Sequence, residues 1–181
     1  KLPLCGEINA DIIRTAFGGA ETEAASPVTG LPQRPPVFCP SCAHRGLFTI
    51  LSKLKVFVSG DIGCYTLGAL PPMSAMHSVI DMGASISAAH GMAKVNAIAG
   101  RDEKPVAVIG DSTFFHSGMT GLMSMAYNGG NALVIIMDNR TTSMTGQQEN
   151  PASGLTLQGK PTNEVDIEAL VRAIGVKVVK R

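Results

Sequence analysis

The chain has 181 residues, of which 45% are hydrophobic and 16% charged, and this balance indicates a folded domain rather than a disordered chain. Its 15 Lys and Arg residues nearly balance 14 Asp and Glu residues and form no basic stripe, so we expect no nucleic-acid partner. No apolar run approaches the roughly 18 residues of a membrane-spanning helix, so we expect no membrane partner. The chain starts at Lys1 and ends on an apolar segment, so we expect it to be a fragment of a longer protein.

Residues 1–36 are predicted to form a lead-in helix followed by a Pro-rich linker. The helix prediction rests on apolar residues at helical spacing, namely Ile8, Ile12, Ile13, Ala16 and Phe17. Gly18-Gly19 is expected to end this helix. The linker prediction rests on Ser26-Pro27, Gly30, Pro32 and Pro35-Pro36. We therefore expect the folded domain to span residues 37–181.

Residues 37–181 alternate between short apolar segments and amphipathic segments. The short segments predict strands over residues 55–59, 77–81, 106–109, 132–137 and 176–179. The amphipathic segments predict helices over residues 47–54, 83–99, 119–127 and 167–174. Apolar strands separated by helices indicate an α/β fold in which a parallel sheet is covered by helices on both faces.

A polar loop follows each of the first four predicted strands, at residues 60–64, 81–83, 110–112 and 138–141. Parallel strands end at one edge of a sheet, and open α/β folds bind ligands at that edge. The sequence contains neither a GxxxxGK[ST] loop nor a GxGxxG loop, and these four loops supply acids and amides with almost no Lys or Arg. An anionic ligand would therefore need a metal, and Asp111 and Asn139 supply the hard oxygen ligands that suit Mg²⁺.

Gly110-Asp111-Ser112 and Asp138-Asn139 are separated by one predicted helix and one predicted strand. This pattern resembles the thiamine diphosphate motif, which reads GDG and, about a helix and a strand later, NN. Ser112 replaces the second Gly and Asp138 replaces the first Asn, and neither position is an expected metal ligand. The resemblance implies a thiamine-diphosphate-binding fold in which Asp111 and Asn139 bind Mg²⁺ through their side chains and Thr141 through its carbonyl.

A wider set of motifs runs along the domain, at residues 39–46 (CPSCAHRG), 60–65 (GDIGCY), 82–85 (MGAS), 110–118 (GDSTFFHSG) and 144–147 (MTGQ). Together they resemble the 2-oxoacid:ferredoxin oxidoreductases, and among these the indolepyruvate type of α subunit. This resemblance implies oxidative decarboxylation of an arylpyruvate to an acyl-CoA, with electrons passing through iron–sulfur clusters to ferredoxin.

The resemblance also implies which parts of the enzyme lie elsewhere. In this family the glutamate that activates the cofactor's aminopyrimidine belongs to a separate pyrimidine-binding domain, and a β subunit completes the enzyme. We therefore expect thiamine diphosphate and Mg²⁺ as cofactors, and ferredoxin, arylpyruvate and CoA as partners of the whole enzyme. The fragment alone is expected to be inactive and to expose an apolar face, through which it self-associates as a homo-oligomer or binds the missing domain.

The same resemblance implies a set of site residues. Cofactor contacts are predicted from Gly63, Cys64, Tyr65, Met82, Gly83, Ala84, Gly110, Asp111, Ser112, Thr113, Asn139, Thr141, Ser143, Met144 and Thr145. His44 and His116 are predicted to be catalytic, as donors of a hydrogen bond or a proton, with structural loop contacts as the alternative. His77 and His90 are expected to be structural.

Three cysteines, Cys39, Cys42 and Cys64, lie within the motifs. In some relatives the matching positions hold a [4Fe–4S] cluster, so we predict a cluster in the intact enzyme; zinc and buried reduced thiols are alternatives. Cys5 lies outside every motif and is expected to be inert. Because four Cys in a chain of this length do not resemble a secreted disulfide scaffold, we expect a reducing compartment, the cytoplasm.

Two other functions compete with the oxidoreductase. A domain of a non-oxidative thiamine diphosphate decarboxylase would have the same cofactor site but no use for the cysteine motifs. A cysteine-based metal module with a structural role would bind metal at Cys39, Cys42 and Cys64 and have no affinity for thiamine diphosphate.

Overall fold

The computed structural model describes residues 1–20 and 29–181. The predicted linker residues Ser26 and Pro27 lie outside these described residues. The chain divides into two compact units, Lys1–Pro35 and Pro36–Arg181. Within the two described ranges, none of the helices combines the length and the apolar character that crossing a membrane requires.

The first unit contains one short helix, α1 (Ala10–Ala16). Asn9 caps its start, because Asn9 Oδ1 accepts hydrogen bonds from the backbone N–H groups of Asp11 (3.1 Å) and Ile12 (3.0 Å). Ile8 precedes this cap and therefore lies outside the helix that its spacing predicts. The helix ends before Gly18, whose φ of +84° favours glycine.

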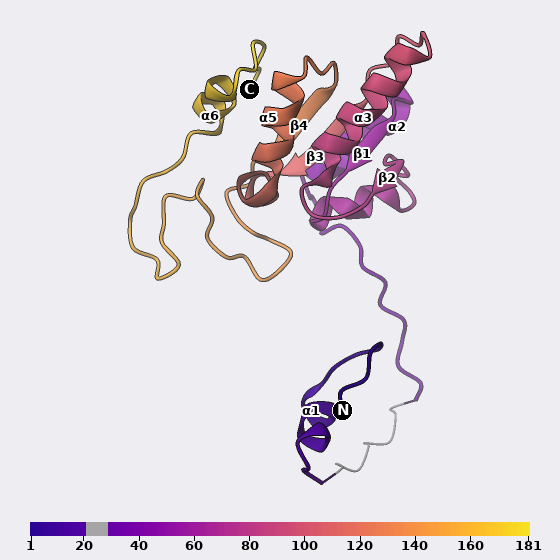
Figure 1. Ribbon diagram of the computed structural model, residues 1–181, viewed down its shortest axis with the longest axis vertical. Helices are drawn as coiled ribbons and strands as arrows, with labels where there is room; N and C mark the ends of the chain where they lie inside the picture. The colour runs from indigo at the N-terminus through magenta and orange to yellow at the C-terminus, as the bar shows by residue number, and fades with distance from the viewer. Residues whose placement is uncertain (21–28) are drawn as a thin grey trace. The chain divides into compact units, whose positions relative to one another are not determined.

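A parallel four-stranded sheet lies at the centre of the second unit (Figure 1). In spatial order its strands are β2 (Ser78–Val79), β1 (Val58–Gly60), β3 (Val106–Gly110) and β4 (Leu133–Met137). β3 and β4 pair from Val106 opposite Leu133 to Gly110 opposite Met137. The α/β fold with a parallel sheet, predicted from the sequence, is confirmed.

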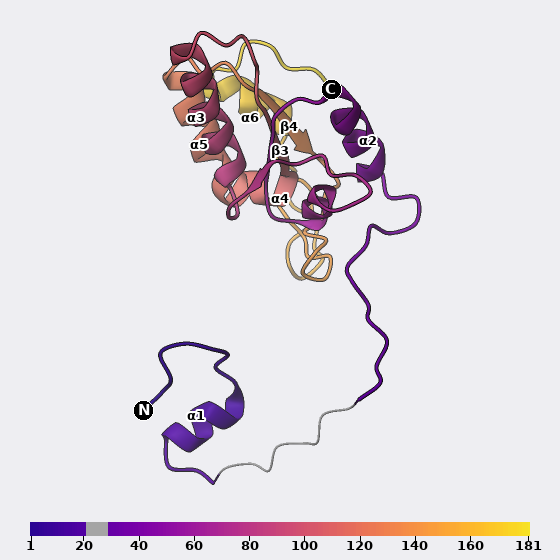
Figure 2. The same ribbon diagram turned by 90° about the vertical axis from the view of Figure 1, so that its right-hand side faces the viewer.

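Helices cover both faces of this sheet (Figure 2). α3 (Ala84–Ile98) and α5 (Met119–Tyr127) lie against one face, and α2 (His44–Leu54) lies against the other. The residues of β3 alternate between two buried clusters. Ala107 and Ile109 pack with the cluster of α3 and α5, whereas Val106 and Val108 pack with the cluster of α2. Burial on both sides explains why this strand is apolar throughout.

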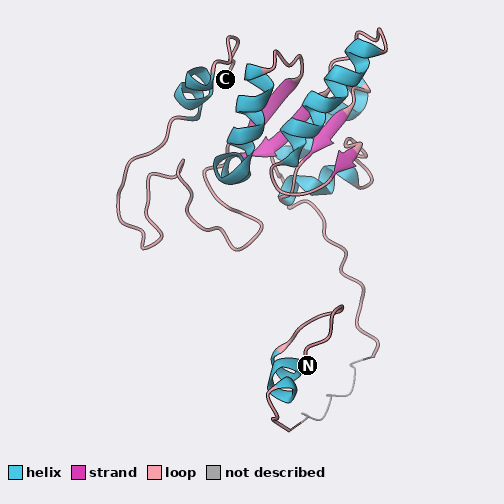
Figure 3. Ribbon diagram, in the orientation of Figure 1, coloured by secondary structure: helices cyan, strands magenta, loops and turns pink. Residues whose placement is uncertain are grey.

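Short helical turns carry the chain across the carboxyl edge of the sheet. η1 (Cys64–Ala69) follows β1, and α4 (Asp111–Thr113) follows β3 directly. α4 continues through the π-helical turn η2 (Phe114–Gly118) into α5. After β4, residues 138–166 form a long loop that ends at α6 (Ile167–Ile174) (Figure 3). The loops after β1, β3 and β4 therefore start from one edge of the sheet.

Two details differ from the sequence-based predictions. The prediction of a strand over residues 176–179 is wrong, because Val176 and Val179 pack their apolar side chains against the cluster of α3 and α5 without joining the sheet. The inward face of α2 also differs from the face that the helical spacing of Leu47, Ile50, Leu51 and Leu54 predicts. Phe48 is fully buried beside Leu51, whereas Ile50 is 57% exposed.

Candidate cofactor-binding site

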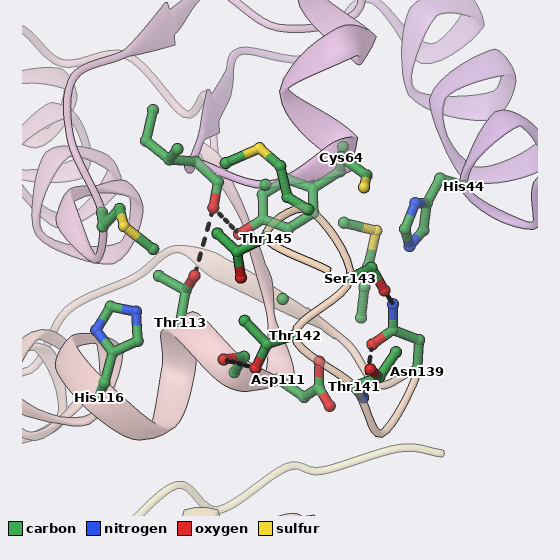
Figure 4. Close-up of a pocket in the computed structure, with 18 residues that line it drawn as sticks. His44, Cys64, Asp111, Thr113, His116, Asn139, Thr141, Thr142, Ser143 and Thr145 are labelled. Carbon is green, nitrogen blue, oxygen red and sulfur yellow. Dashed lines mark hydrogen bonds between the residues drawn. The ribbon is translucent and has the colours of Figure 1, made fainter. Parts of the chain in front are cut away.

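A cavity of about 190 Å³ lies at the carboxyl edge of β1, β3 and β4. The loops that follow these strands, Met82 and the first residue of α2 line it (Figure 4). Its lining consists of His44, Ile62, Gly63, Cys64, Tyr65, Met82, Gly110, Asp111, Ser112, Thr113, His116, Met137, Asn139, Thr141, Thr142, Ser143, Met144 and Thr145.

Asp111 supplies a buried carboxylate to this cavity. It is the first residue of α4, directly after β3, and is only 2% exposed. Asn150, far along the loop after β4, donates a hydrogen bond from Nδ2 to Asp111 Oδ2 (2.9 Å). Among the described residues Asn150 is the sole hydrogen-bond donor to this carboxylate. The other oxygen, Oδ1, therefore keeps its capacity to bind a ligand.

Asn139 and Thr141 reach the same cavity from the loop after β4 (Figure 4). Asn139 Nδ2 donates to Ser143 Oγ (2.9 Å), and the backbone N–H of Thr141 donates to Asn139 Oδ1 (3.2 Å). These two bonds orient the amide, and Oδ1 retains a second lone pair. The hydroxyls of Ser112 and Thr142 lie 2.7 Å apart, so a further hydrogen bond links this loop to α4.

The Tyr65 ring lines the cavity and packs so closely against Gly63 and Gly110 that neither position has room for a side chain. A Cβ added at Gly110 would lie 2.8 Å from Tyr65 Cε1, and one added at Gly63 would overlap the same ring. The Tyr65 hydroxyl donates to the Ile62 carbonyl (2.9 Å). Burial raises the pKa of Tyr65 to about 12, so the phenol keeps its proton and remains a donor at neutral pH.

Asp61, directly after β1, connects two loops at the cavity. Its Oδ1 accepts hydrogen bonds from the backbone N–H groups of Ile62 (2.9 Å) and Gly83 (2.7 Å), and its Oδ2 accepts from Ser85 (3.0 Å). The Asp61 side chain is fully buried. These bonds hold the start of α3 and thereby position the neighbouring Met82, which lines the cavity.

Two of the four histidines line the cavity, and they lie on opposite sides of it (Figure 4). His44 packs edge-on against the Tyr65 ring, with the ring centroids 6.1 Å apart. Burial lowers the pKa of His44, and the Asp111 carboxylate opposes this effect only in part. His44 is therefore neutral near pH 7. His116 occupies the other side, in η2.

The cavity brings together most of the residues that the sequence singles out. Gly83 and Ala84 lie outside its lining, behind Met82. Cys64 is part of the lining, whereas Cys39 and Cys42 are not. All four cysteines are free thiols, and no three His, Cys, Asp or Glu side chains are grouped as metal ligands in residues 1–20 and 29–181.

Sequence reasoning misses several residues that build the site. Asn150 carries no motif, and only the fold brings it to Asp111. Asp61 follows the same strand-then-Asp pattern as Asp111, and this is the signal that points to it. Ser117 follows His116 in η2 and lies outside the cavity lining, but it makes hydrogen-bond contacts with His116 Nδ1 and the Met82 carbonyl. Ile62, Met137 and Thr142 also line the cavity.

The oxygen atoms at the cavity fit a magnesium diphosphate. A buried carboxylate oxygen of Asp111 and an oriented amide oxygen of Asn139 are hard ligands for Mg²⁺. Thr141 adds a backbone carbonyl on the same loop. No Lys or Arg lines the cavity, so a bound diphosphate would need such a metal to offset its charge.

The region that contains this site, apart from His44, matches a known family. Residues 61–181 match the family described as "Thiamine pyrophosphate enzyme, C-terminal TPP binding domain". The indolepyruvate oxidoreductase subunit IorA of Pyrococcus horikoshii is 42% identical over 161 residues, which cover 82% of this chain and 25% of that protein. IorA of Methanothermobacter thermautotrophicus is 38% identical over 192 residues, which cover 99% of this chain and 30% of that protein.

A solved structure shares the fold. The 2-oxoglutarate:ferredoxin oxidoreductase from Magnetococcus marinus, with 2-oxoglutarate, coenzyme A and succinyl-CoA bound, superimposes with a TM-score of 0.62 at 21% identity. The match covers 80% of this chain and 53% of that chain. The resemblance to indolepyruvate-type subunits is confirmed by the relatives, of whose length this chain spans between a quarter and a third. The chain belongs to the thiamine pyrophosphate enzyme family, in which it corresponds to the C-terminal thiamine pyrophosphate-binding domain.

Proposed function

We propose that this chain is the Mg²⁺-diphosphate-binding domain of an indolepyruvate-type 2-oxoacid:ferredoxin oxidoreductase. The observation that carries the proposal is the cavity at the carboxyl edge of the sheet, in which Asp111 and Asn139 present oxygen ligands inside the region matched by the family. The names of the relatives support an oxidoreductase over a non-oxidative decarboxylase. The family match argues against a purely structural cysteine module.

Asp111 Oδ1, Asn139 Oδ1 and the Thr141 carbonyl would hold the Mg²⁺. Asn150 orients Asp111, and Ser143 orients Asn139, so both ligands are preorganised before the metal arrives. Ser112 and Thr113, in the first turn after β3, have hydroxyls beside the diphosphate position. Removing the Asp111 charge is therefore expected to abolish metal-dependent binding.

The size of the cavity supports a site shared between two domains. Its volume of about 190 Å³ is below the roughly 300–1,000 Å³ of pockets that enclose a whole ligand. This chain would hold the diphosphate end, and a pyrimidine-binding domain would cover the rest. Thiamine diphosphate, when bound, supplies the electron sink for decarboxylation of a 2-oxo acid.

The side chains around the cavity would orient the reactants and move protons. Tyr65, Met82 and Cys64 form an apolar side of the cavity and would limit the access of water to the reacting end of the cofactor once the second domain covers them. His44, neutral near pH 7, would exchange a hydrogen bond or a proton with the substrate on one side. His116 would do so on the other side.

The remaining components belong to the proposal for the whole enzyme. We expect a pyrimidine-binding domain, a β subunit and ferredoxin as partners, arylpyruvate and CoA as substrates, a homo-oligomeric assembly and a cytoplasmic location. The iron–sulfur cluster on Cys39, Cys42 and Cys64 stays a prediction. Among the described residues only Cys64 of the three lines the cavity, and the three thiols are not grouped as metal ligands.

Calorimetric titration with thiamine diphosphate tests the proposal, both on this chain and on the full-length subunit assembled with its partner subunit. We expect binding in the presence of Mg²⁺ and its loss in EDTA, and no metal-dependent binding of thiamine, which lacks the diphosphate. Binding that is equally tight without metal, or for thiamine, would contradict the assignment. Reduction of an electron acceptor by the assembled enzyme, dependent on both indolepyruvate and CoA, tests the substrate class.

A further inference from the structure

A hydrogen-bonded chain runs from His116 to the backbone beside the cavity. His116 Nδ1 lies 2.8 Å from Ser117 Oγ. Ser117 Oγ in turn lies 3.2 Å from the carbonyl oxygen of Met82 and 3.4 Å from that of Thr113. Met82 and His116 both line the cavity, whereas Ser117 does not. Ser117 therefore connects two residues of the cavity lining from outside the cavity.

The single hydrogen of Ser117 Oγ couples its choice of acceptor to the tautomer of His116. Ser117 Oγ carries one hydrogen, and both neighbouring carbonyls can only accept. If that hydrogen goes to a carbonyl, Ser117 Oγ has only lone pairs left for His116 Nδ1. We propose that Ser117 is a positioning residue that holds neutral His116 with its proton on Nδ1, so that Nε2 presents a lone pair to the cavity.

The position of Ser117 is itself fixed by the fold. It lies in the π-helical turn η2, a type of distortion that often occurs at functional sites. Its side chain packs against Gly83, where an added Cβ would overlap Ser117 Oγ. Gly83 in turn is held by Asp61. Ser117 Oγ therefore fits against the start of α3 because residue 83 has no side chain.

This assignment sharpens the role proposed for His116 and rests on the proposed function for its ligand. A neutral His116 whose free nitrogen is Nε2 accepts hydrogen bonds from N–H or O–H groups in the cavity. It does not donate to a carboxylate or phosphate until it takes up a proton. His116 would therefore contact a protonated group of the cofactor or substrate, and it is suited to accept a proton from that group.

His77 provides an internal reference with the opposite tautomer. Its Nδ1 accepts a hydrogen bond from the backbone N–H of Val58 (3.1 Å). A backbone N–H can only donate, so Nδ1 of His77 carries the lone pair and Nε2 carries the proton. His77 and His116 should therefore show opposite tautomers in one spectrum of the same sample.

Long-range ¹H–¹⁵N correlation spectra of the full 181-residue chain, recorded without cofactor at alkaline pH where the imidazoles are neutral, test the proposal. His116 is assigned by the signals lost in His116→Gln. We expect Nδ1 of His116 to be of the protonated type and Nε2 of the unprotonated type, with the reverse for His77. The reverse pattern for His116, or an even mixture of tautomers, would overturn the proposal.

A pair of serine variants separates positioning from a general effect on the fold. In Ser117→Ala the tautomer ratio of His116 should move toward the Nε2-protonated form by about fivefold, the effect of one hydrogen bond of ordinary strength. Ser124→Ala, in the exposed part of α5, should leave it unchanged. An unchanged ratio in Ser117→Ala, or an equal shift in both variants, would contradict the proposal.

Failure of this inference can be told apart from failure of the proposed function. The tautomer is measured without cofactor, and Mg²⁺-dependent binding of thiamine diphosphate is measured separately on the same protein. The predicted tautomer without cofactor binding would leave the Ser117–His116 pair intact and contradict the cofactor site. Cofactor binding with the other tautomer would contradict the role of Ser117 alone.

Discussion

The chain contains two Gly-Asp pairs, Gly60-Asp61 and Gly110-Asp111, each at the end of a central strand of one parallel sheet. Both aspartates are buried, at 0% and 2% exposure. They differ in their partners. Asp61 accepts three hydrogen bonds from backbone N–H groups, whereas Asp111 accepts one, from the Asn150 side chain, among the described residues.

The difference shows why burial alone does not identify a ligand-binding carboxylate. The three amides satisfy Asp61, which has little capacity left and acts as a structural connection between two loops. Asp111 lines the cavity and is buried with one neutral donor among the described residues, so a nearby cation would stabilise its charge. The same dipeptide at the same edge therefore has two roles, set by the loops that surround it.

Asp111→Asn should give the largest change in ligand binding. The amide keeps the shape and can still accept from Asn150, but it removes the charge that binds the metal. Loss of a residue that only hydrogen-bonds to a metal ligand typically lowers metal affinity by roughly 10–100-fold. Because Asp111 would be a ligand itself, we expect Mg²⁺-dependent affinity for thiamine diphosphate to fall by more than this. The free energy of unfolding should change by no more than about 1 kcal/mol, as measured by urea denaturation. Retained affinity would contradict the role of Asp111.

Asp61→Asn should show the opposite pattern. An amide has one accepting oxygen, and its NH₂ group would face a backbone N–H that now lacks an acceptor. We expect the free energy of unfolding to fall by about 3–5 kcal/mol, because hydrogen bonds to a buried charge are lost. Urea denaturation of this variant beside Asp111→Asn provides the comparison. If Asp111→Asn proved the less stable of the two, the roles assigned here would be reversed.

Gly83→Ala tests the connection that Asp61 makes. Gly83 has a φ of +92° and contacts Ser117, so a methyl group there would be strained and would collide with the hydroxyl. We expect a loss of about 2–4 kcal/mol in stability. Gly91→Ala, within α3, is the control, since nothing lies within 4 Å of its added Cβ. That substitution should stabilise the chain by about 0.5–1 kcal/mol.

Tyr65 predicts a smaller effect that appears only at high pH. The pKa of Tyr65 is raised from 10.0 to about 12 by burial, so the native state keeps this proton while the unfolded chain releases it. Its contribution to stability is present below pH 10 and is lost as the pH rises toward 12. Across this window wild type should lose about 1–3 kcal/mol more than Tyr65→Phe in urea denaturation. Parallel losses in the two proteins would contradict the buried phenol.

Sequence patterns predict the fold well because the sheet is buried on both faces. The apolar residues of β3 and β4 can be read directly, and a helix follows or precedes each strand. The pattern fails at residues 176–179, where Val176 and Val179 are partly buried against the cluster of α3 and α5 and Val178 is exposed, and none of them pairs with the sheet. A local sequence pattern indicates that a segment is apolar, but it does not indicate whether the segment joins the sheet or packs against other elements.

The residues of the candidate site also divide into those that the sequence predicts and those that only the fold reveals. Asp111, Asn139 and Thr141 are predictable because they sit in motifs at strand ends. Asn150 lies in no motif, and Ser117 lies within the motif of residues 110–118 but outside the cavity lining, so their contacts with Asp111 and Met82 become visible only in the folded chain. A motif can therefore identify residues near the site, but it does not show which of them bind a ligand and which orient their neighbours.

A crystal structure with thiamine diphosphate and Mg²⁺ tests the central comparison most directly. We predict the metal at roughly 2.1 Å from a carboxylate oxygen of Asp111, with the Asn139 amide oxygen and the Thr141 carbonyl in the same shell. Asp61 should keep its three backbone hydrogen bonds and remain away from the ion. A metal bound by Asp61, or a diphosphate whose metal does not contact Asp111, would contradict the account.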